Sequence, residues 1–301
     1  MEKIVERIKE LKKSRDAVIL AHNYQLPEVQ EVADYLGDSL ELSRIAARIE
    51  AKVIVLCGVY FMAETASVLC PDKKILIPDL QAGCPLANMI TAEDVRKLRA
   101  SHSKAVVVGY VNTPAEVKAE LDYACTSSNA IAVVNYLSNY EEIIFIPDKY
   151  LTDYVAKKTN RKLIGWKGYC PTHAKITLED VLEQKKLHPS AKVLSHPECK
   201  ADVLQVSDAV VSTSGMCKYV KDSPAREFII ATEKELIHRL TKENPGKSFF
   251  AASDLAVCPN MKRINLEKVL FSLEDLKYEV KVSPEVRKSA NMAIERMLKI
   301  V

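Results

Sequence analysis

Short runs of apolar, often β-branched residues alternate along this chain with segments whose apolar positions recur at helical spacing. The runs predict strands at 17–21, 53–58, 74–77, 105–109, 142–146, 162–165, 191–194, 227–231 and 248–251. Helices are expected between them, near 39–51 and 62–69 in the first group of three strands. Strands that alternate with helices predict βαβ units with right-handed crossovers, and therefore parallel sheets.

Both ends of the chain predict further elements. Segment 1–14 mixes acidic and basic residues around spaced apolar positions, which is typical of an amphipathic helix. After the last apolar run, a helix at 266–275, a strand at 278–282 and a helix at 284–300 are expected. We expect this closing segment to pack back on the first group of strands.

The three groups of strands share more than their order. Their first runs begin at Ala17, Ala105 and Ala191, which are 88 and 86 residues apart. Polar residues follow at fixed offsets: His22, Tyr110 and His196 after five residues, Tyr24, Asn112 and Glu198 after seven, and Ser39, Ser127 and Thr213 after twenty-two. Self-similarity at a fixed period indicates a threefold internal repeat.

Three cysteines follow the same period. Cys84, Cys170 and Cys258 are 86 and 88 residues apart, and a proline follows each of them. Equivalent points of a threefold repeat can meet on one axis, and three converging thiolates form a metal or iron–sulfur site with one open metal position. Cys70 also precedes a proline but lies outside the period. Because the chain has no CxxC pair, a 4Fe-4S cluster with three thiolates fits better than a zinc knuckle.

We therefore expect an α/β fold of three three-layer αβα lobes with short parallel sheets, related by a pseudo-threefold axis that carries the active site. The first lobe spans 1–86 and is completed by the tail 265–301, the second spans 87–172, and the third spans 173–264. Units of this size need neighbours to bury enough apolar surface, so the lobes should form one body.

Composition and charge narrow the class of protein. The 301 residues are 48% hydrophobic and 28% charged, with a net charge of +3, which argues against a nucleic-acid partner. The longest uncharged apolar stretch, 53–63, is shorter than the ~18 residues that a membrane span needs. Since no signal peptide is visible, we expect a cytoplasmic protein whose eight cysteines bind metal or react rather than form disulfides.

The repeated polar residues are candidates for catalysis and binding. Ligands of parallel sheets bind beyond the carboxyl ends of the strands, where the five- and seven-residue offsets fall. Histidine exchanges protons near neutral pH, and an apolar site makes tyrosine and glutamate acid–base candidates as well. Any one of these residues alone could equally be a turn or core residue. Matching offsets in three units favour a shared site.

Ser39, Ser127 and Thr213 stand where helices are expected to begin. One interpretation is that each hydroxyl caps its helix by accepting a backbone N–H. A second is that the three helix N-termini bind carboxylate or phosphate groups of a polyanionic substrate, for which few arginines would be needed. The two interpretations are compatible.

Several short segments together resemble the quinolinate synthase family along essentially the whole chain. They are Ala21-His-Asn-Tyr-Gln, Gly37-Asp-Ser, Phe61-Met-Ala-Glu, Tyr110-Val-Asn, Cys125-Thr-Ser-Ser-Asn, Cys170-Pro-Thr-His, His196-Pro-Glu-Cys, Ser212-Thr-Ser-Gly-Met and Val257-Cys-Pro-Asn-Met-Lys. The resemblance implies a 4Fe-4S cluster on Cys84, Cys170 and Cys258, with one iron open to substrate. It also implies that iminosuccinate condenses with dihydroxyacetone phosphate to quinolinate in NAD biosynthesis, releasing phosphate and two waters.

The resemblance further implies roles for the repeated residues. Substrate or intermediates would bind to His22, Tyr110, Asn112, Ser127, His196, Glu198 and Thr213, with Ser39 and Tyr24 beside them. Our hypothesis for the catalytic base is Glu198, with His196, Tyr24, Tyr110 and His22 as further proton-transfer candidates. His173 either faces the site or orients a neighbour. Iminosuccinate would come from an aspartate-oxidising partner enzyme.

Two alternatives stay open at this point. Diphthamide-forming radical enzymes also have three lobes with one cysteine each, but they would need S-adenosylmethionine and a protein substrate. A non-catalytic metabolite- or metal-binding module would hold zinc or no metal and show no turnover. Iron and sulfide in anaerobically prepared protein would argue against this second alternative.

Overall fold

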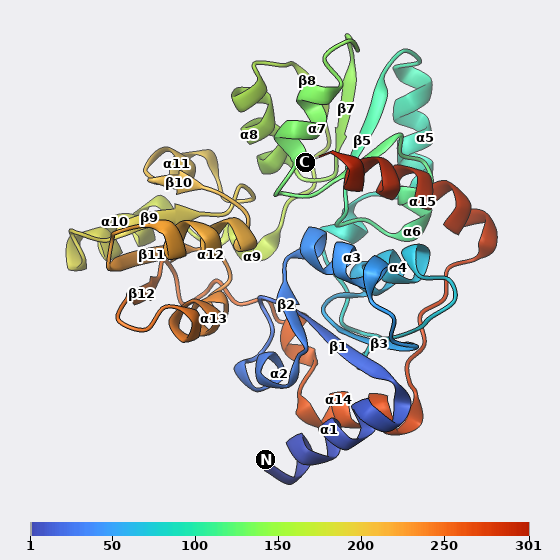
Figure 1. Ribbon diagram of the computed structural model, residues 1–301. Helices are drawn as coiled ribbons and strands as arrows, with labels where there is room; N and C mark the ends of the chain where they lie inside the picture. The colour runs from blue at the N-terminus through green and yellow to red at the C-terminus, as the bar shows by residue number, and fades with distance from the viewer. Residues whose placement is uncertain (1, 301) are drawn as a thin grey trace.

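The computed structural model describes residues 2–300 and contains three four-stranded parallel sheets, one in each lobe. Their strand orders are β2-β1-β3-β4, β6-β5-β7-β8 and β10-β9-β11-β12, so each sheet has the same topology. Figure 1 shows the lobes side by side, with the first in blue, the second in green and the third in yellow to orange. Identical topology in three lobes agrees with the internal repeat, and the α/β class with layered lobes is confirmed.

The elements follow in chain order. The first lobe contains α1 (Glu2–Arg15), β1 (Ala17–His22), α2 (Pro27–Val32), β2 (Tyr35–Gly37), α3 (Ser39–Arg48), β3 (Val53–Cys57), α4 (Tyr60–Leu69) and β4 (Lys74–Leu76). The second contains η1 (Ala87–Met89), α5 (Ala92–Ser101), β5 (Val106–Tyr110), α6 (Ala115–Lys118), β6 (Tyr123–Cys125), α7 (Ala130–Tyr136), β7 (Ile143–Ile146), α8 (Lys149–Thr159), β8 (Leu163–Gly165) and α9 (Pro171–Ala174). The third contains α10 (Leu178–Leu187), β9 (Lys192–Ser195), α11 (Ala201–Gln205), β10 (Ala209–Val210), α12 (Thr213–Asp222), β11 (Glu227–Ala231), α13 (Leu236–Glu243), β12 (Ser248–Ala251) and η2 (Met261–Arg263).

The predicted strands of the repeat all form, because helices cover both faces of each sheet and apolar runs can be buried there. Strands β3, β5 and β7 are buried at every residue. The sequence pattern missed the edge strands β2, β6 and β10, which have only two or three residues each. The strand expected at 278–282 is wrong, since an isolated antiparallel bridge between Leu76 and Glu279 stands in its place.

The two closing helices pack in different places. Helix α14 (Leu266–Asp275) lies against α1 and β3 of the first lobe. Helix α15 (Pro284–Lys299) lies against α6 and β6 of the second lobe and also contacts α4 of the first, as Figure 1 shows for the red helix. Met1 of the first predicted helix falls outside the described residues. The lobe boundaries at 86, 172 and 264 stay a prediction.

Asp38 joins the three lobes at the start of α3. Its carboxylate caps this helix by accepting from the backbone N–H groups of Leu40 and Glu41, at 3.1 and 3.0 Å. Ser128 of the second lobe and Ser212 of the third donate to its other oxygen, at 2.7 and 3.1 Å. One carboxylate therefore serves as a helix cap and as a link between lobes.

Replacement of Asp38 by alanine should lower the free energy of unfolding by about 2–4 kcal/mol, since a helix cap and two further hydrogen bonds are lost. The matched control is Thr91→Ala, which removes the exposed cap of α5 alone and should cost about 1 kcal/mol. Denaturant unfolding of both variants measures the difference. Equal losses would show that the bonds to Ser128 and Ser212 contribute nothing to stability.

Candidate active site

One cavity is lined by every residue that the sequence singled out for catalysis, binding or metal ligation. Its wall includes His22, Tyr24, Ser39, Cys84, Tyr110, Asn112, Ser127, Cys170, His196, Glu198, Thr213 and Cys258, and also His173. These residues come from all three lobes. Strands β1 and β5 end at His22 and Tyr110, and β9 ends just before His196, so the cavity lies beyond the carboxyl ends of the first strands.

The three cysteine loops are held in the same way. In each lobe the carbonyl oxygen two residues before the cysteine accepts from a backbone N–H located three residues after β3, β7 or β11. The N–H of Tyr60 donates to the carbonyl of Ala82 at 2.7 Å, that of Lys149 to Gly168 at 2.8 Å, and that of Lys234 to Ala256 at 3.0 Å. A short helical turn, η1, α9 or η2, follows each cysteine. The repeat therefore extends to the hydrogen bonds that place the thiols.

Two buried carboxylates that the sequence analysis missed hold the second and third cysteine loops. Asp148 accepts from the backbone N–H of Cys170 at 3.2 Å, and Glu233 accepts from that of Cys258 at 3.1 Å. Lys262 forms an ion pair with the same oxygen of Glu233 at 2.8 Å. Asp148 and Glu233 lie 43 and 42 residues after the alanines that begin their units, so the repeat contained a signal for them.

The environment of the three thiols is suited to metal ligation. Burial raises the pKa of Cys84 to about 12 and also raises the pKa values of Cys170 and Cys258. In each loop, the backbone N–H three residues further on acts in the opposite direction by stabilising the thiolate; these groups belong to Ala87, His173 and Met261. A buried thiol that keeps its proton when free loses it to solvent when a metal binds, because the charge of the metal compensates the thiolate.

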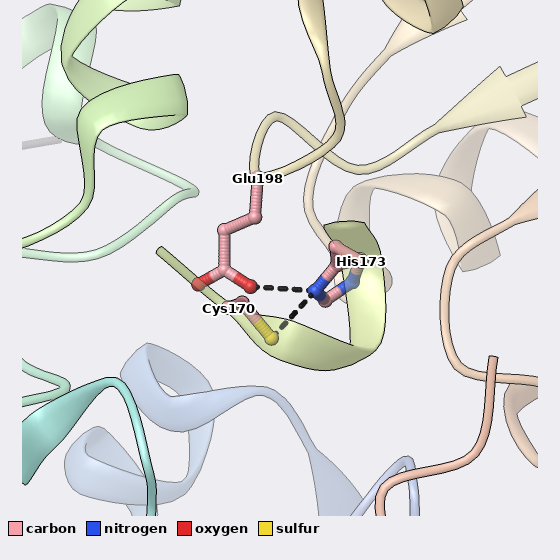
Figure 2. Close-up of side chains that lie close together, drawn as sticks. All are labelled: Cys170, His173 and Glu198. Carbon is pink, nitrogen blue, oxygen red and sulfur yellow. Dashed lines mark hydrogen bonds and ion pairs between the residues drawn. The ribbon is translucent and has the colours of Figure 1, made fainter. Parts of the chain in front are cut away.

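Glu198, His173 and Cys170 form a compact cluster in the cavity, shown in Figure 2. His173 Nδ1 lies 2.7 Å from Glu198 Oε2 and 3.1 Å from Cys170 Sγ. Burial is the largest single influence and would raise the pKa of the Glu198 carboxyl, but His173, His196 and a hydrogen bond from Tyr110 together outweigh burial and hold that pKa below its usual value. Glu198 is therefore an ionised carboxylate, able to accept a proton. The three ligating atoms lie within 4.8 Å of one another, so the cluster could also contact a bound metal.

Hydrogen bonds fix the tautomers of two histidines at equivalent positions. Burial lowers the pKa of His22 to about 4 and that of His196 to about 3, so both rings are neutral near pH 7. The Nδ1 atom of each ring accepts from the backbone N–H two residues further on, at 3.2 Å from Tyr24 and 3.3 Å from Glu198. Each proton therefore resides on Nε2, which in His196 donates to Ser127 Oγ at 3.1 Å.

The expectation that Ser39, Ser127 and Thr213 are helix caps is wrong. Asp38 caps α3 and Ser212 caps α12, so that Ser39 and Thr213 are the first residues of their helices. Ser127 lies in the turn before Asn129, the cap position of α7. The three hydroxyl groups are thus available to line the cavity, where all of them lie.

The cavity presents hydrogen-bond donors without presenting cations. Its lining residues include no lysine and no arginine. Burial raises the pKa values of Tyr24 and Tyr110, so both phenols keep their protons at neutral pH. Neutral imidazole N–H, phenol and hydroxyl groups can all donate to carboxylate or phosphate oxygens. Such a wall suits an anionic small molecule.

These features define an α/β enzyme of three similar lobes, with a three-thiol site in the cavity between them. Comparison with known families assigns it further: the chain belongs to the quinolinate synthase family, because the family model described as quinolinate synthetase A protein matches residues 6–299. This assignment favours neither the diphthamide-forming enzymes nor a non-catalytic binding module.

Individual relatives agree with the family. The chain is 52% identical over 297 residues to the quinolinate synthase of Methanosarcina barkeri, covering 99% of this chain and 97% of the relative. It is 50% identical over 300 residues to that of Dehalococcoides mccartyi strain CBDB1, covering 100% and 99% of the two chains. It is 48% identical over 299 residues to that of Thermodesulfovibrio yellowstonii, covering 99% and 98%.

Proposed function

We propose that this chain condenses iminosuccinate with dihydroxyacetone phosphate to form quinolinate, with release of phosphate and two waters, as a step of NAD biosynthesis in the cytoplasm. The observation that carries the proposal is the single cavity in which twelve residues from three lobes meet. They include each residue that resemblance to the quinolinate synthase family implied for substrate and cluster. Within residues 2–300, every helix is too short or too polar to cross a bilayer.

The proposed cofactor is a 4Fe-4S cluster on Cys84, Cys170 and Cys258. The donor set fits this group, since three thiols with matched backbone N–H partners line one cavity. None of the remaining five cysteines lines that cavity, so the protein supplies three thiolates and leaves one iron for a ligand of another kind. When bound, the cluster would supply a Lewis-acidic iron that polarises a substrate oxygen.

The side chains around the cavity would bind the substrates and move protons. The hydroxyls of Ser39, Ser127 and Thr213 would donate to the carboxylates and the phosphate. We assign Glu198 as the base that removes a proton from the carbon chain, because it is ionised and lies in the cavity wall. Tyr24 and Tyr110 keep their protons and would donate them to oxygens that leave as water.

The surroundings of the cavity support substrates of negative charge. A second cleft shares Asp38 and Ser127 with the cavity, and its lining includes Arg44, Arg48 and Lys218. These cations would attract anions toward a wall that has hydrogen-bond donors but no lysine or arginine of its own. Iminosuccinate is the product expected of an enzyme that oxidises aspartate, which we propose as the functional partner.

The proposed activity has a direct test. Anaerobically prepared, iron-loaded protein should form quinolinate from dihydroxyacetone phosphate and iminosuccinate that an aspartate-oxidising enzyme generates in the same vessel. Chromatography with an authentic quinolinate standard measures the product. Omission of dihydroxyacetone phosphate is the control and should give none. Absence of quinolinate from the complete mixture, with the protein's iron and sulfide intact, would contradict the proposal.

A further inference from the structure

Two hydrogen bonds, the second of them buried, connect Arg239 of α13 to the hydroxyl of Thr213 in the cavity wall. Arg239 Nη1 donates to Asn23 Oδ1 at 2.7 Å, and Asn23 Nδ2 donates to Thr213 Oγ1 at 2.8 Å. The same guanidinium nitrogen also donates to the carbonyl of Leu36 at 3.1 Å. Asn23 is completely buried, and Thr213 is 2% exposed. Neither Asn23 nor Arg239 lines the cavity, so neither touches a ligand there, and their side-chain hydrogen bonds reach the cavity through Thr213.

The chemistry of these groups fixes the direction of both bonds. A guanidinium group has donors only, so the amide oxygen of Asn23 must face Arg239. The amide NH₂ of Asn23 then faces Thr213 and can only donate to it. Thr213 Oγ is therefore the acceptor in this pair, and its own proton is left to point elsewhere. Since Thr213 lines the cavity, that proton is available to a ligand there.

We infer that Asn23 and Arg239 are positioning residues that hold the Thr213 hydroxyl as a hydrogen-bond donor to an anionic group, carboxylate or phosphate, of the substrate. The inference deepens the proposed function and rests on it. A hydroxyl oriented in advance needs no reorganisation when the anion arrives. Asn23 belongs to the first lobe, whereas Thr213 and Arg239 belong to the third. The Thr213 hydroxyl is therefore oriented only when these two lobes are in contact.

The sharpest variant is Asn23→Asp. It keeps the size of the side chain and its acceptor toward Arg239, but a carboxylate cannot donate to Thr213, whose proton must then turn toward it. The affinity for quinolinate, measured by titration calorimetry on anaerobic, iron-loaded protein, should fall about 10- to 100-fold. The substrate KM should rise similarly, with a smaller change in kcat. A purely structural defect would instead lower the active fraction and leave KM unchanged.

A double-mutant cycle separates positioning from simple charge repulsion. Thr213→Val should weaken quinolinate binding about 10- to 100-fold by itself. Added to Thr213→Val, the Asn23→Asp change should weaken binding little further, because the hydroxyl through which it acts is gone. A full additional loss in the Thr213→Val background would show that the new carboxylate repels the ligand directly, and would overturn the inference.

Arg239 provides a second, independent route should Asn23→Asp fail to fold. Arg239→Met removes the donor that orients the Asn23 amide, so the amide can rotate by 180° and quinolinate binding should weaken several-fold. Arg239→Lys should restore binding, because lysine is also a donor only. Glu243→Gln, which removes the ion pair of Arg239 on the same helix, is the matched control and should bind as wild type does. If Arg239→Met binds quinolinate as tightly as wild type, the inference is overturned, but the proposed function still stands. A wild-type chain that neither forms nor binds quinolinate would overturn the proposed function and the inference with it.

Discussion

Replacement of Cys170 by alanine is expected to remove the iron and sulfide of the anaerobically prepared protein and to abolish quinolinate formation. Cys170 is one of three thiols in the cavity, and two thiolates are too few to hold the cluster that we propose the protein binds through three. The remaining wall offers no further cysteine to replace it. Iron and sulfide analysis, together with the visible absorption of the protein, measures the loss.

Cys70→Ala is the matched control for this variant. Cys70 also precedes a proline and is buried, but its thiol contacts the carbonyl of Ala46 at 3.1 Å and does not line the cavity. We expect this variant to keep its iron and its turnover. A cluster retained by Cys170→Ala, or one lost equally in Cys70→Ala, would contradict the assignment of the three ligands.

Replacement of Glu198 by glutamine should leave the cluster in place and lower kcat by about 10²- to 10⁴-fold, the range that loss of a general base produces. The amide keeps the size of the side chain but cannot accept a proton from carbon. Glu198 Oε2 lies 2.7 Å from His173 Nδ1, so the imidazole loses the charge of its partner but keeps an acceptor. Steady-state rates and iron content, measured on the same preparation, separate catalysis from cluster loss.

Glu64→Gln gives the comparison, because Glu64 is also a buried carboxylate but lies outside the cavity wall. Its Oε2 atom accepts from the backbone N–H of Ala115 at 3.2 Å, which an amide oxygen can also do. This variant should turn over at nearly the wild-type rate. Wild-type turnover by Glu198→Gln would remove Glu198 from the role of base.

The order of strands and helices was predictable from the local pattern of apolar residues. The candidate site residues were predictable from the period of the internal repeat. Strands buried on both faces leave apolar runs, and a repeat of about 87 residues marks equivalent positions without any knowledge of contacts. Cys84, Cys170 and Cys258 were found in this way. The edge strands β2, β6 and β10, of two or three residues each, were not found in this way.

The sequence by itself determined which residue types recur at which offsets, and hence that three lobes would share one site. Only the tertiary structure decided which atoms meet: Asn23 and Thr213 are 190 positions apart and still share a hydrogen bond, and α15 packs on the second lobe as well as the first. It also decided the charge of each group, since burial keeps His196 neutral while neighbouring groups, His173 foremost, keep Glu198 ionised. Period and propensity are local properties of a chain, whereas partners, tautomers and pKa values depend on neighbours that folding brings together.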